Sequence, residues 1–97
     1  MYEIIYTQAS LADLKWFKKH EQVQIIDAIN THLKYQPDRE TRNLKRMKSN
    51  LYAQWELRIG NFRILYNIEQ EVQIVEIQRL GEKQGNQFFF RGQGDNL

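Results

Sequence analysis

The sequence predicts one small α+β domain, in which a four-stranded, largely antiparallel sheet carries an N-terminal helical hairpin on one face. The chain has 97 residues, 41% of them hydrophobic and 27% charged, which is the size and composition of one ordinary globular domain. Near the N-terminus, two segments with helical spacing follow a β-branched segment. In the middle of the chain, alternating apolar residues flank a Gly-Asn pair, a pattern typical of a β-hairpin.

The first predicted elements are a strand and a short helix. Residues 2–6 are aromatic and β-branched, which favours a strand. A helix is predicted over 10–19, because Ser10 and Asp13 resemble a capping box and apolar residues follow at helical spacing. The basic residues 18–20 then close this helix, where the helix dipole favours positive charge.

A second helix is predicted to extend to about residue 35. Pro37 lies just beyond that position, where helices usually stop. The two helices are therefore expected to form a hairpin over the sheet. The predicted apolar stripe of the second helix contains Val23, Ile26, either Ile29 or Asn30, and Leu33.

Residues 55–66 are predicted to form two strands joined by the two-residue turn Gly60-Asn61, because both residues tolerate the positive φ of tight turns better than most. So short a loop fixes the register and places large apolar residues on one face. The other face pairs Arg58 with Arg63, whose charges repel unless an acidic neighbour or a bound anion compensates. The predicted pairs on the apolar face are Trp55 with Tyr66, Leu57 with Ile64, and Ile59 with Phe62.

The C-terminal part is predicted to contain one more strand, over 72–77. The glycine-punctuated residues 80–87 are then expected to form a loop. The consecutive phenylalanines 88–90 cannot all be buried on one strand face, so one is expected to seal the core edge and another to face a ligand or partner. The domain is expected to span 1–97, with 91–97 as a frayed tail.

Several kinds of site are not expected. The chain has no cysteine, which excludes disulfides and thiolate chemistry and fits a cytoplasmic protein. Its two histidines lack metal-ligand spacing, and no glycine-rich nucleotide loop is present, so we expect neither a metal nor a cofactor. No apolar run reaches the roughly 18 residues of a membrane span, and no secretory signal is recognised.

The cationic residues instead suggest a site for an anion. Arg58 and Arg63 share a strand face, and Lys83 follows the last predicted strand. Because arginine binds phosphate oxygens in a bidentate fork, this arrangement predicts binding of a phosphodiester. A basic connector before the hairpin extends the same chemistry. Its cations are Arg39, Arg42, Lys45, Arg46 and Lys48.

Each of these features also has a purely structural interpretation. The connector is as well explained as a solvated segment, because runs of charge usually face water. The aromatic residues Phe88–Phe90 or Trp16 could stack on bases, but aromatics near a chain end more often complete a core. An arginine on the sheet face could pair with Glu56 or Glu76.

The order of the elements and the segment Glu56-Leu57-Arg58-Ile59-Gly60-Asn61-Phe62-Arg63-Ile64-Leu65-Tyr66 resemble the RelE/ParE superfamily of bacterial type II toxins. The resemblance covers residues 2–90, and its most specific parts are this hairpin, LR-x-G-x-(F/Y)-R-x-(L/V)-Y, and Gly81 at the end of the final strand. It implies an antiparallel-type sheet carrying a helical hairpin. RelE-like members cut messenger RNA in the ribosomal A site, ParE-like members poison DNA gyrase, and an antitoxin holds both inactive.

The resemblance also implies roles for single residues. Arg63 matches the arginine that contacts the scissile phosphate in the RelE-like nucleases. A further catalytic arginine matches Glu82 or Lys83, of which Lys83 keeps the charge. The departures from the RelE-like pattern are Gln54 and Glu56, in place of two lysines, and Phe89, in place of a tyrosine implicated in proton transfer.

We therefore predict the toxin of a type II toxin–antitoxin pair that cleaves messenger RNA, with Arg63, Lys83 and Arg58 as its catalytic residues. The connector cations and Phe89 are the predicted RNA-binding residues. The alternatives are ParE-like action on DNA gyrase and a degenerate member that binds only antitoxin or nucleic acid. The expected partners are a cognate antitoxin and RNA or the ribosome. For the oligomeric state, the sequence allows both a homodimer and a hetero-oligomer with the antitoxin.

Overall fold

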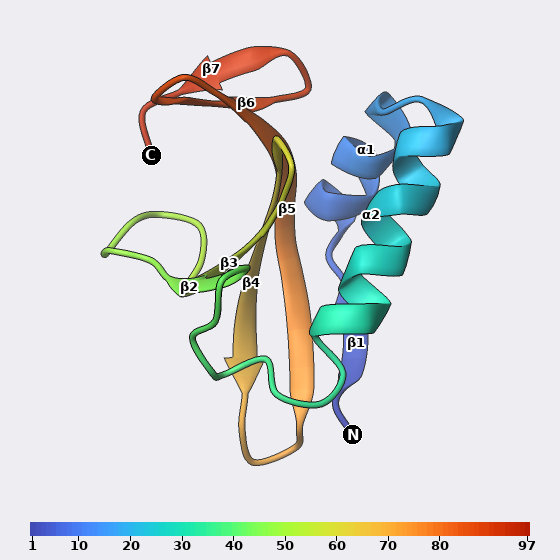
Figure 1. Cartoon of the computed structure of the whole chain (residues 1–97), viewed down its shortest axis with the longest axis vertical. Helices are drawn as coiled ribbons and strands as arrows, with labels where there is room; N and C mark the ends of the chain where they lie inside the picture. The colour runs from blue at the N-terminus through green and yellow to red at the C-terminus, as the bar shows by residue number, and fades with distance from the viewer.

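Seven β-strands form one sheet with two helices against it, in a computed structural model that describes residues 1–97. Six strands follow the order β2-β3-β4-β5-β6-β7, and β1 joins the sheet by pairing with β5 (Figure 1). The β1–β5 pair is parallel and all the other pairs are antiparallel. The elements are β1 Glu3–Tyr6, α1 Gln8–Trp16, α2 Lys19–His32, β2 Leu44–Arg46, β3 Trp55–Ile59, β4 Phe62–Glu69, β5 Ile74–Gln84, β6 Gln87–Phe90 and β7 Gln93–Asp95.

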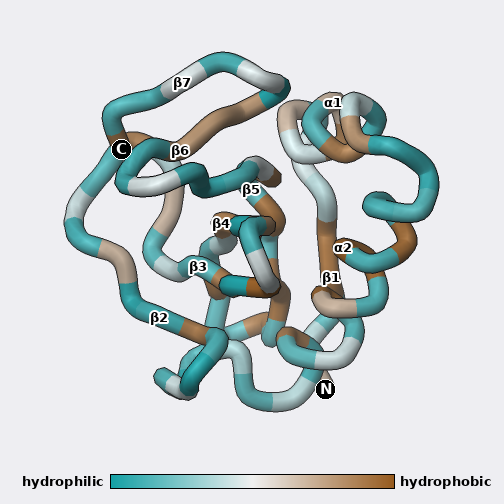
Figure 2. The backbone as a smooth tube through the Cα atoms, turned by 45° about the horizontal axis from the view of Figure 1, so that its top comes forward, coloured by the Kyte–Doolittle hydropathy of each residue, from teal (hydrophilic) through white to brown (hydrophobic).

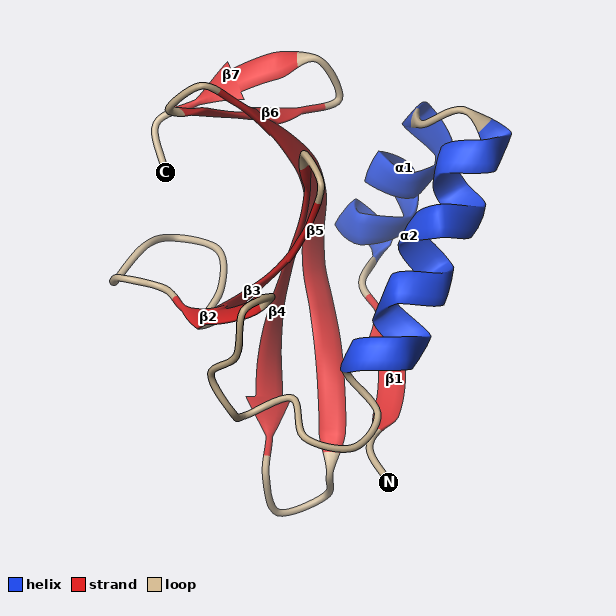
Figure 3. Cartoon of the chain, in the orientation of Figure 1, coloured by secondary structure: helices blue, strands red, loops and turns tan.

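The molecule has two layers, with α1 and α2 on one face of the curved sheet (Figure 3). The predicted class is thereby confirmed: an α+β fold with an N-terminal helical hairpin on one face of a largely antiparallel sheet. Hydrophobic segments of β1, α2 and β5 lie in the interior, whereas β7 is hydrophilic (Figure 2). Neither helix has the length and hydrophobicity needed to cross a membrane.

The central hairpin has the predicted register. Ile59 pairs with Phe62, Arg58 with Arg63, and Trp55 with Tyr66. Gly60 has φ +54°, whereas Asn61 does not take a positive φ, which is the pattern of a type II′ turn with glycine at its first central position. The apolar face of the hairpin belongs to the core under the helices, as predicted.

The predicted number of four strands is wrong, because three further strands were assigned to a connector, a loop and a tail. The connector contains β2, which pairs with β3. The expected loop at 80–87 is instead the end of β5, a two-residue turn at Gly85-Asn86 and the start of β6. The expected frayed tail, 91–97, contains β7, which pairs with β6 through a turn in which Arg91 and Gly92 both take positive φ.

The helix boundaries also differ from the prediction. Thr7, and not Ser10, caps α1, since the Thr7 side chain accepts a hydrogen bond from the Ser10 backbone N–H at 3.2 Å. The first helix ends at Trp16, and the predicted closing residues Lys19 and His20 begin α2 instead. Val23 is 52% exposed, so the predicted stripe is partly wrong. The residues of the second helical segment that reach the core are Ile25, Ala28, Ile29 and Leu33.

One edge of β5 is shared by two strands with a gap between them. On this edge β1 pairs with residues 74–77 and β6 with 82–84, so the backbone between them has a strand partner, β4, only on the opposite edge. Side chains of the α1 region fill this gap: the Thr7 hydroxyl donates to the Gln78 carbonyl at 3.1 Å, and Asp13 accepts from the Leu80 N–H at 3.0 Å. The helical layer is thus attached to the sheet by hydrogen bonds as well as by apolar packing.

Candidate functional site

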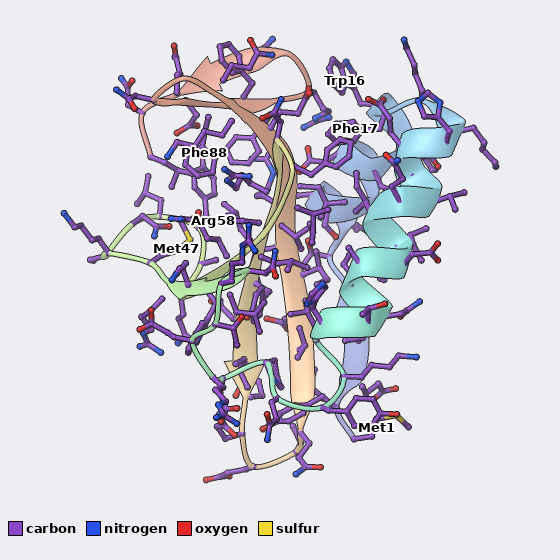
Figure 4. The ribbon with its side chains drawn as sticks, viewed as in Figure 1. Met1, Trp16, Phe17, Met47, Arg58 and Phe88 are labelled. Atoms are coloured by element: carbon purple, nitrogen blue, oxygen red, sulfur yellow. The ribbon has the colours of Figure 1, made fainter.

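The face of the sheet away from the helices carries a groove of about 420 Å³. In Figure 4, Phe88, Arg58 and Met47 lie together on this side, opposite Trp16 and Phe17 beside the helices. Strands β2, β3, β5 and β6 and the loop after β2 contribute the lining. The lining residues are Arg46, Met47, Lys48, Ser49, Asn50, Glu56, Arg58, Lys83, Phe88 and Leu97.

Four of the predicted cationic residues meet in this groove although they come from three separate parts of the chain. Arg46 and Lys48 come from β2 and its following loop, Arg58 from β3, and Lys83 from the end of β5. The Arg46 guanidinium lies 5.5 Å from the Trp55 ring centroid, a cation–π distance. Four cations against one acidic side chain give the groove the charge that a phosphodiester requires.

Phe88, and not Phe89, is the aromatic residue of the groove. The register of the second hairpin pairs Phe88 with Lys83, and the Lys83 ammonium lies 5.7 Å from the Phe88 ring centroid. Phe88 stacks on Phe90 at 6.3 Å between ring centroids. Because side chains alternate along a strand, Phe89 points to the opposite face of the sheet. The Gly85-Asn86 turn therefore decides which phenylalanine faces the groove.

The other predicted site residues lie outside this groove. Arg39 donates to the Gln36 side chain at 3.3 Å on the exposed connector, and Arg42 is exposed beside it. Lys45 lies in β2, paired in register with Glu56. Arg63 stands next to the groove, since it is the direct partner of Arg58 in β3 and of Gly81 in β5.

The arginine pair across the hairpin is compensated by an acid. The Glu56 carboxylate accepts from Arg58 Nε, as one of the alternative interpretations of the sequence expected. Arg63 turns back to the hairpin loop, where its Nη1 donates to the Gly60 and Phe62 carbonyls at 2.8 and 2.9 Å. Burial lowers the pKa of Arg63, the neighbouring Glu56 opposes this, and the charge of Arg58 adds to it.

Arg63 also retains one buried donor without an acceptor. Its Nε is the only buried side-chain nitrogen or oxygen of the protein that lacks a hydrogen-bond partner. An orphaned, charged donor is a costly arrangement, which an anion in the groove could relieve only if the Arg63 side chain turned from the hairpin loop toward the groove.

The loop between β2 and β3 forms one wall of the groove, and a single asparagine organises it. Asn50 Oδ1 accepts from the backbone N–H groups of Tyr52 and Ala53 at 2.8 and 3.0 Å, and Nδ2 donates to the Lys48 and Ala53 carbonyls. The Tyr52 hydroxyl then donates to Asp95 of β7 at 2.7 Å. This hydrogen bond raises the pKa of Tyr52 and joins the loop to the C-terminal hairpin.

A buried ion pair supports the opposite wall. Asp13 of α1 is completely buried and receives two hydrogen bonds from Arg79, at 2.7 and 3.0 Å. The hydrogen bond to Asp13 raises the pKa of Arg79, and burial opposes the shift. The Arg79 guanidinium lies 4.3 Å from the Phe90 ring centroid, so the ion pair supports the aromatic stack of the groove.

Four residues that shape the site are not among those predicted from the sequence: Asp13, Asn50, Tyr52 and Arg79. Asp13 was interpreted as part of a helix cap, and the residues it meets lie more than sixty positions away. A signal for the second hairpin was present, since Gly85-Asn86 repeats the dipeptide of the central turn. Nowhere in the structure do three or more histidine, cysteine, aspartate or glutamate side chains gather as they would around a metal ion.

Comparison with known proteins gives one family and several solved structures with the same fold. The model of the family described as the ParE toxin of type II toxin–antitoxin system, parDE, matches residues 4–85. No curated protein sequence matches the chain. Among solved structures, the RelBE2 toxin–antitoxin complex from Mycobacterium tuberculosis contains a chain with TM-score 0.73 and 23% identity, and the match covers 84% of this chain and 98% of that one.

Two further solved structures have the same fold. A chain of the archaeal RelE–RelB complex from Pyrococcus horikoshii OT3 matches with TM-score 0.67 and 15% identity, over 87% of this chain and 96% of that one. A chain of the intact RelBE toxin–antitoxin complex from E. coli matches with TM-score 0.59 and 15% identity, over 87% and 99%. At these identities the matches establish a shared fold.

Proposed function

Since the chain belongs to the ParE toxin family of type II toxin–antitoxin systems, we propose that it arrests growth by binding messenger RNA in the cationic groove and cleaving it. The observation that supports RNA cleavage is the convergence of Arg58, Lys83 and Phe88 in one groove. Guanidinium and ammonium groups bind phosphate and stabilise the charge that develops when a phosphodiester is cleaved. An aromatic ring beside them offers a surface on which a base can stack.

Arg63 is the residue proposed to contact the scissile phosphate. Its Nε has no hydrogen-bond partner in the protein, and the neighbouring Arg58 and Lys83 supply further charge for the same phosphate. The connector cations Arg39, Arg42 and Lys45 extend the basic surface along the bound strand. Phe89, which lacks a hydroxyl, is assigned no proton transfer.

The antitoxin of the pair is the proposed protein partner. The three similar structures are complexes of a toxin with its antitoxin. An antitoxin that covers the groove would neutralise its positive charge, and we expect acidic side chains in the part of the antitoxin that reaches it.

Expression in a bacterial host without the antitoxin tests the proposal. We expect the wild type to stop growth and fragment messenger RNA, and Arg63→Ala to lower the cleavage rate by about 10²–10³-fold, the usual cost of removing one transition-state donor. Lys19→Ala is the matched control, because it removes an exposed cation on the helical side. Intact transcripts in cells arrested by the wild type would refute RNA cleavage.

Gyrase poisoning is the second candidate, and the match to the ParE family favours it. The same strains distinguish the two functions. A DNA-damage response with intact transcripts would indicate gyrase as the target, whereas fragmented transcripts without that response would indicate RNA cleavage. A wild-type protein that causes neither effect and only binds its antitoxin or DNA would identify the degenerate alternative.

A further inference from the structure

One acidic side chain lies in the cationic groove. Glu56 is 5% exposed, and it is the only acidic side chain among the lining residues, beside Arg46, Lys48, Arg58 and Lys83. A carboxylate repels the phosphates of a bound nucleic acid, and burying its charge costs free energy unless a partner compensates. Its presence therefore calls for a role that a neutral residue would not fill.

The two oxygens of Glu56 have different surroundings. Oε1 accepts from Arg58 Nε, which fixes the carboxylate. No donor of the protein forms a hydrogen bond with Oε2. Arg63 Nε is the only buried side-chain atom without a hydrogen-bond partner, so Oε2 is exposed to solvent. Since Glu56 lines the groove, Oε2 is a free acceptor that is open to a molecule bound there.

The Glu56–Arg58 pair also leaves donors free on the arginine. Arg58 uses Nε for Glu56, and neither of its Nη groups has a protein partner. A phosphate bound by the Nη groups would thus lie beside a carboxylate oxygen that can only accept. Along the backbone of a nucleic acid, the group that can donate to such an oxygen is the 2′-hydroxyl of RNA, which DNA lacks.

We infer that Glu56 is the general base of RNA cleavage, taking the proton of the 2′-hydroxyl next to a phosphate held by Arg58. This inference depends on the proposed function as a ribonuclease. In the step, the 2′-hydroxyl proton passes to Glu56 Oε2, and the 2′-oxygen forms a bond to phosphorus. The bond from phosphorus to the 5′-oxygen breaks, and that oxygen takes a proton from the Lys83 ammonium or from water. The products are a 2′,3′-cyclic phosphate and a 5′-hydroxyl.

A role limited to positioning Arg58 predicts a different result for one variant. The amide oxygen of Glu56→Gln still accepts from Arg58 Nε but does not take a proton. If Glu56 only holds Arg58, Glu56→Gln keeps most of the cleavage rate. If Glu56 is the base, Glu56→Gln loses about 10²–10⁴-fold in rate, and binding of uncleavable RNA stays within a few-fold.

The experiment compares wild type, Glu56→Gln and Glu56→Asp at equal protein levels in the antitoxin-free host. The rate of transcript fragmentation is measured, and the new RNA ends are mapped by adaptor ligation with and without prior 5′-phosphorylation. An RNA end with a 5′-hydroxyl is ligated only after phosphorylation, so the two samples distinguish 5′-hydroxyl from 5′-phosphate ends. A 2′-O-methylated RNA oligonucleotide measures binding to the purified proteins. Glu76→Gln, the same chemical change on β5 outside the groove, is the control, and thermal melts verify that each variant folds.

We expect 5′-hydroxyl ends from the wild type, slow cleavage with unchanged binding by Glu56→Gln, and partial activity of Glu56→Asp, which keeps a carboxylate. The inference would be overturned if Glu56→Gln cleaved RNA as fast as the wild type, or if the wild type produced 5′-phosphate ends. Either result would leave the proposed ribonuclease function standing. Wild-type arrest with intact RNA would overturn ribonuclease function itself, and the inference with it.

Discussion

Replacing Asp13 by asparagine tests whether a buried carboxylate joins the helical layer to the groove. The change keeps the shape of the side chain and removes its charge. Asp13 accepts two hydrogen bonds from Arg79 and one from the Leu80 backbone, and its Oδ1 lies 3.1 Å from Arg91 Nε. In Asp13→Asn, the Arg79 guanidinium, whose side chain is only 17% exposed, would lose its counter-charge.

The expected loss of stability is large. Removing one partner of a buried ion pair costs about 3–5 kcal/mol, and the remaining carbonyl oxygen of asparagine places the change near the lower value. A domain of this length has a free energy of unfolding of roughly 5–15 kcal/mol. A loss of about 3 kcal/mol lowers the melting temperature by roughly 12–24 °C. About 2–12 kcal/mol would remain, so Asp13→Asn is expected to fold at room temperature and to melt at a clearly lower temperature than the wild type.

Urea unfolding followed by circular dichroism measures the loss, with Asp27→Asn as the control. Asp27 is an exposed helical aspartate without an ion pair, so its change should cost less than about 0.5 kcal/mol. A double-mutant cycle with Arg79→Gln should give a coupling free energy of about 1–3 kcal/mol. A loss below about 1 kcal/mol for Asp13→Asn, or a cycle without coupling, would refute the role given to this pair.

Three further predictions concern the sheet and its hydrogen bonds. Gly81→Ala should lower the free energy of unfolding by about 1–3 kcal/mol in urea unfolding and disturb Phe90. The reason is that a Cβ would lie 2.5 Å from the Phe89 carbonyl oxygen and 2.8 Å from the Phe90 ring. A melting curve like that of the wild type would contradict this. Tyr52→Phe removes the hydrogen bond to Asp95, so it should lower the free energy of unfolding by about 1 kcal/mol and speed amide hydrogen exchange in β7. Unchanged exchange would show that this bond does not hold the strand. Burial raises the pKa of Tyr66, so the unfolded chain releases that proton first and stability should fall as the pH rises above about 10. Urea unfolding between pH 9 and 11 measures this effect, and the free energy of unfolding of Tyr66→Phe should fall less over this range than that of the wild type.

The candidate site was predictable where its residues follow local rules. Arg58 lies on the face of the central hairpin that the alternation of apolar residues predicts. Lys83 was predicted from its position after the last apolar segment alone, and it lines the groove. The choice between Phe88 and Phe89 was not predictable in the same way, because it depends on the register that the Gly85-Asn86 turn imposes between two polar strand ends. The flanking residues do not alternate in hydrophobicity, so the turn signal lacked support.

By itself the sequence determined the fold class, the register of the central hairpin and its apolar face. These features depend on turn geometry and hydrophobic periodicity, which act between residues close in the chain. Only the tertiary structure decided that Asp13 meets Arg79, that Tyr52 meets Asp95, and that Glu56 is the single acid of the cationic groove. The first two pairs join residues 66 and 43 positions apart, and Glu56 gains its surroundings from several strands. No local pattern encodes such meetings, because each arises when packing brings charged or polar groups out of water and requires a partner for them.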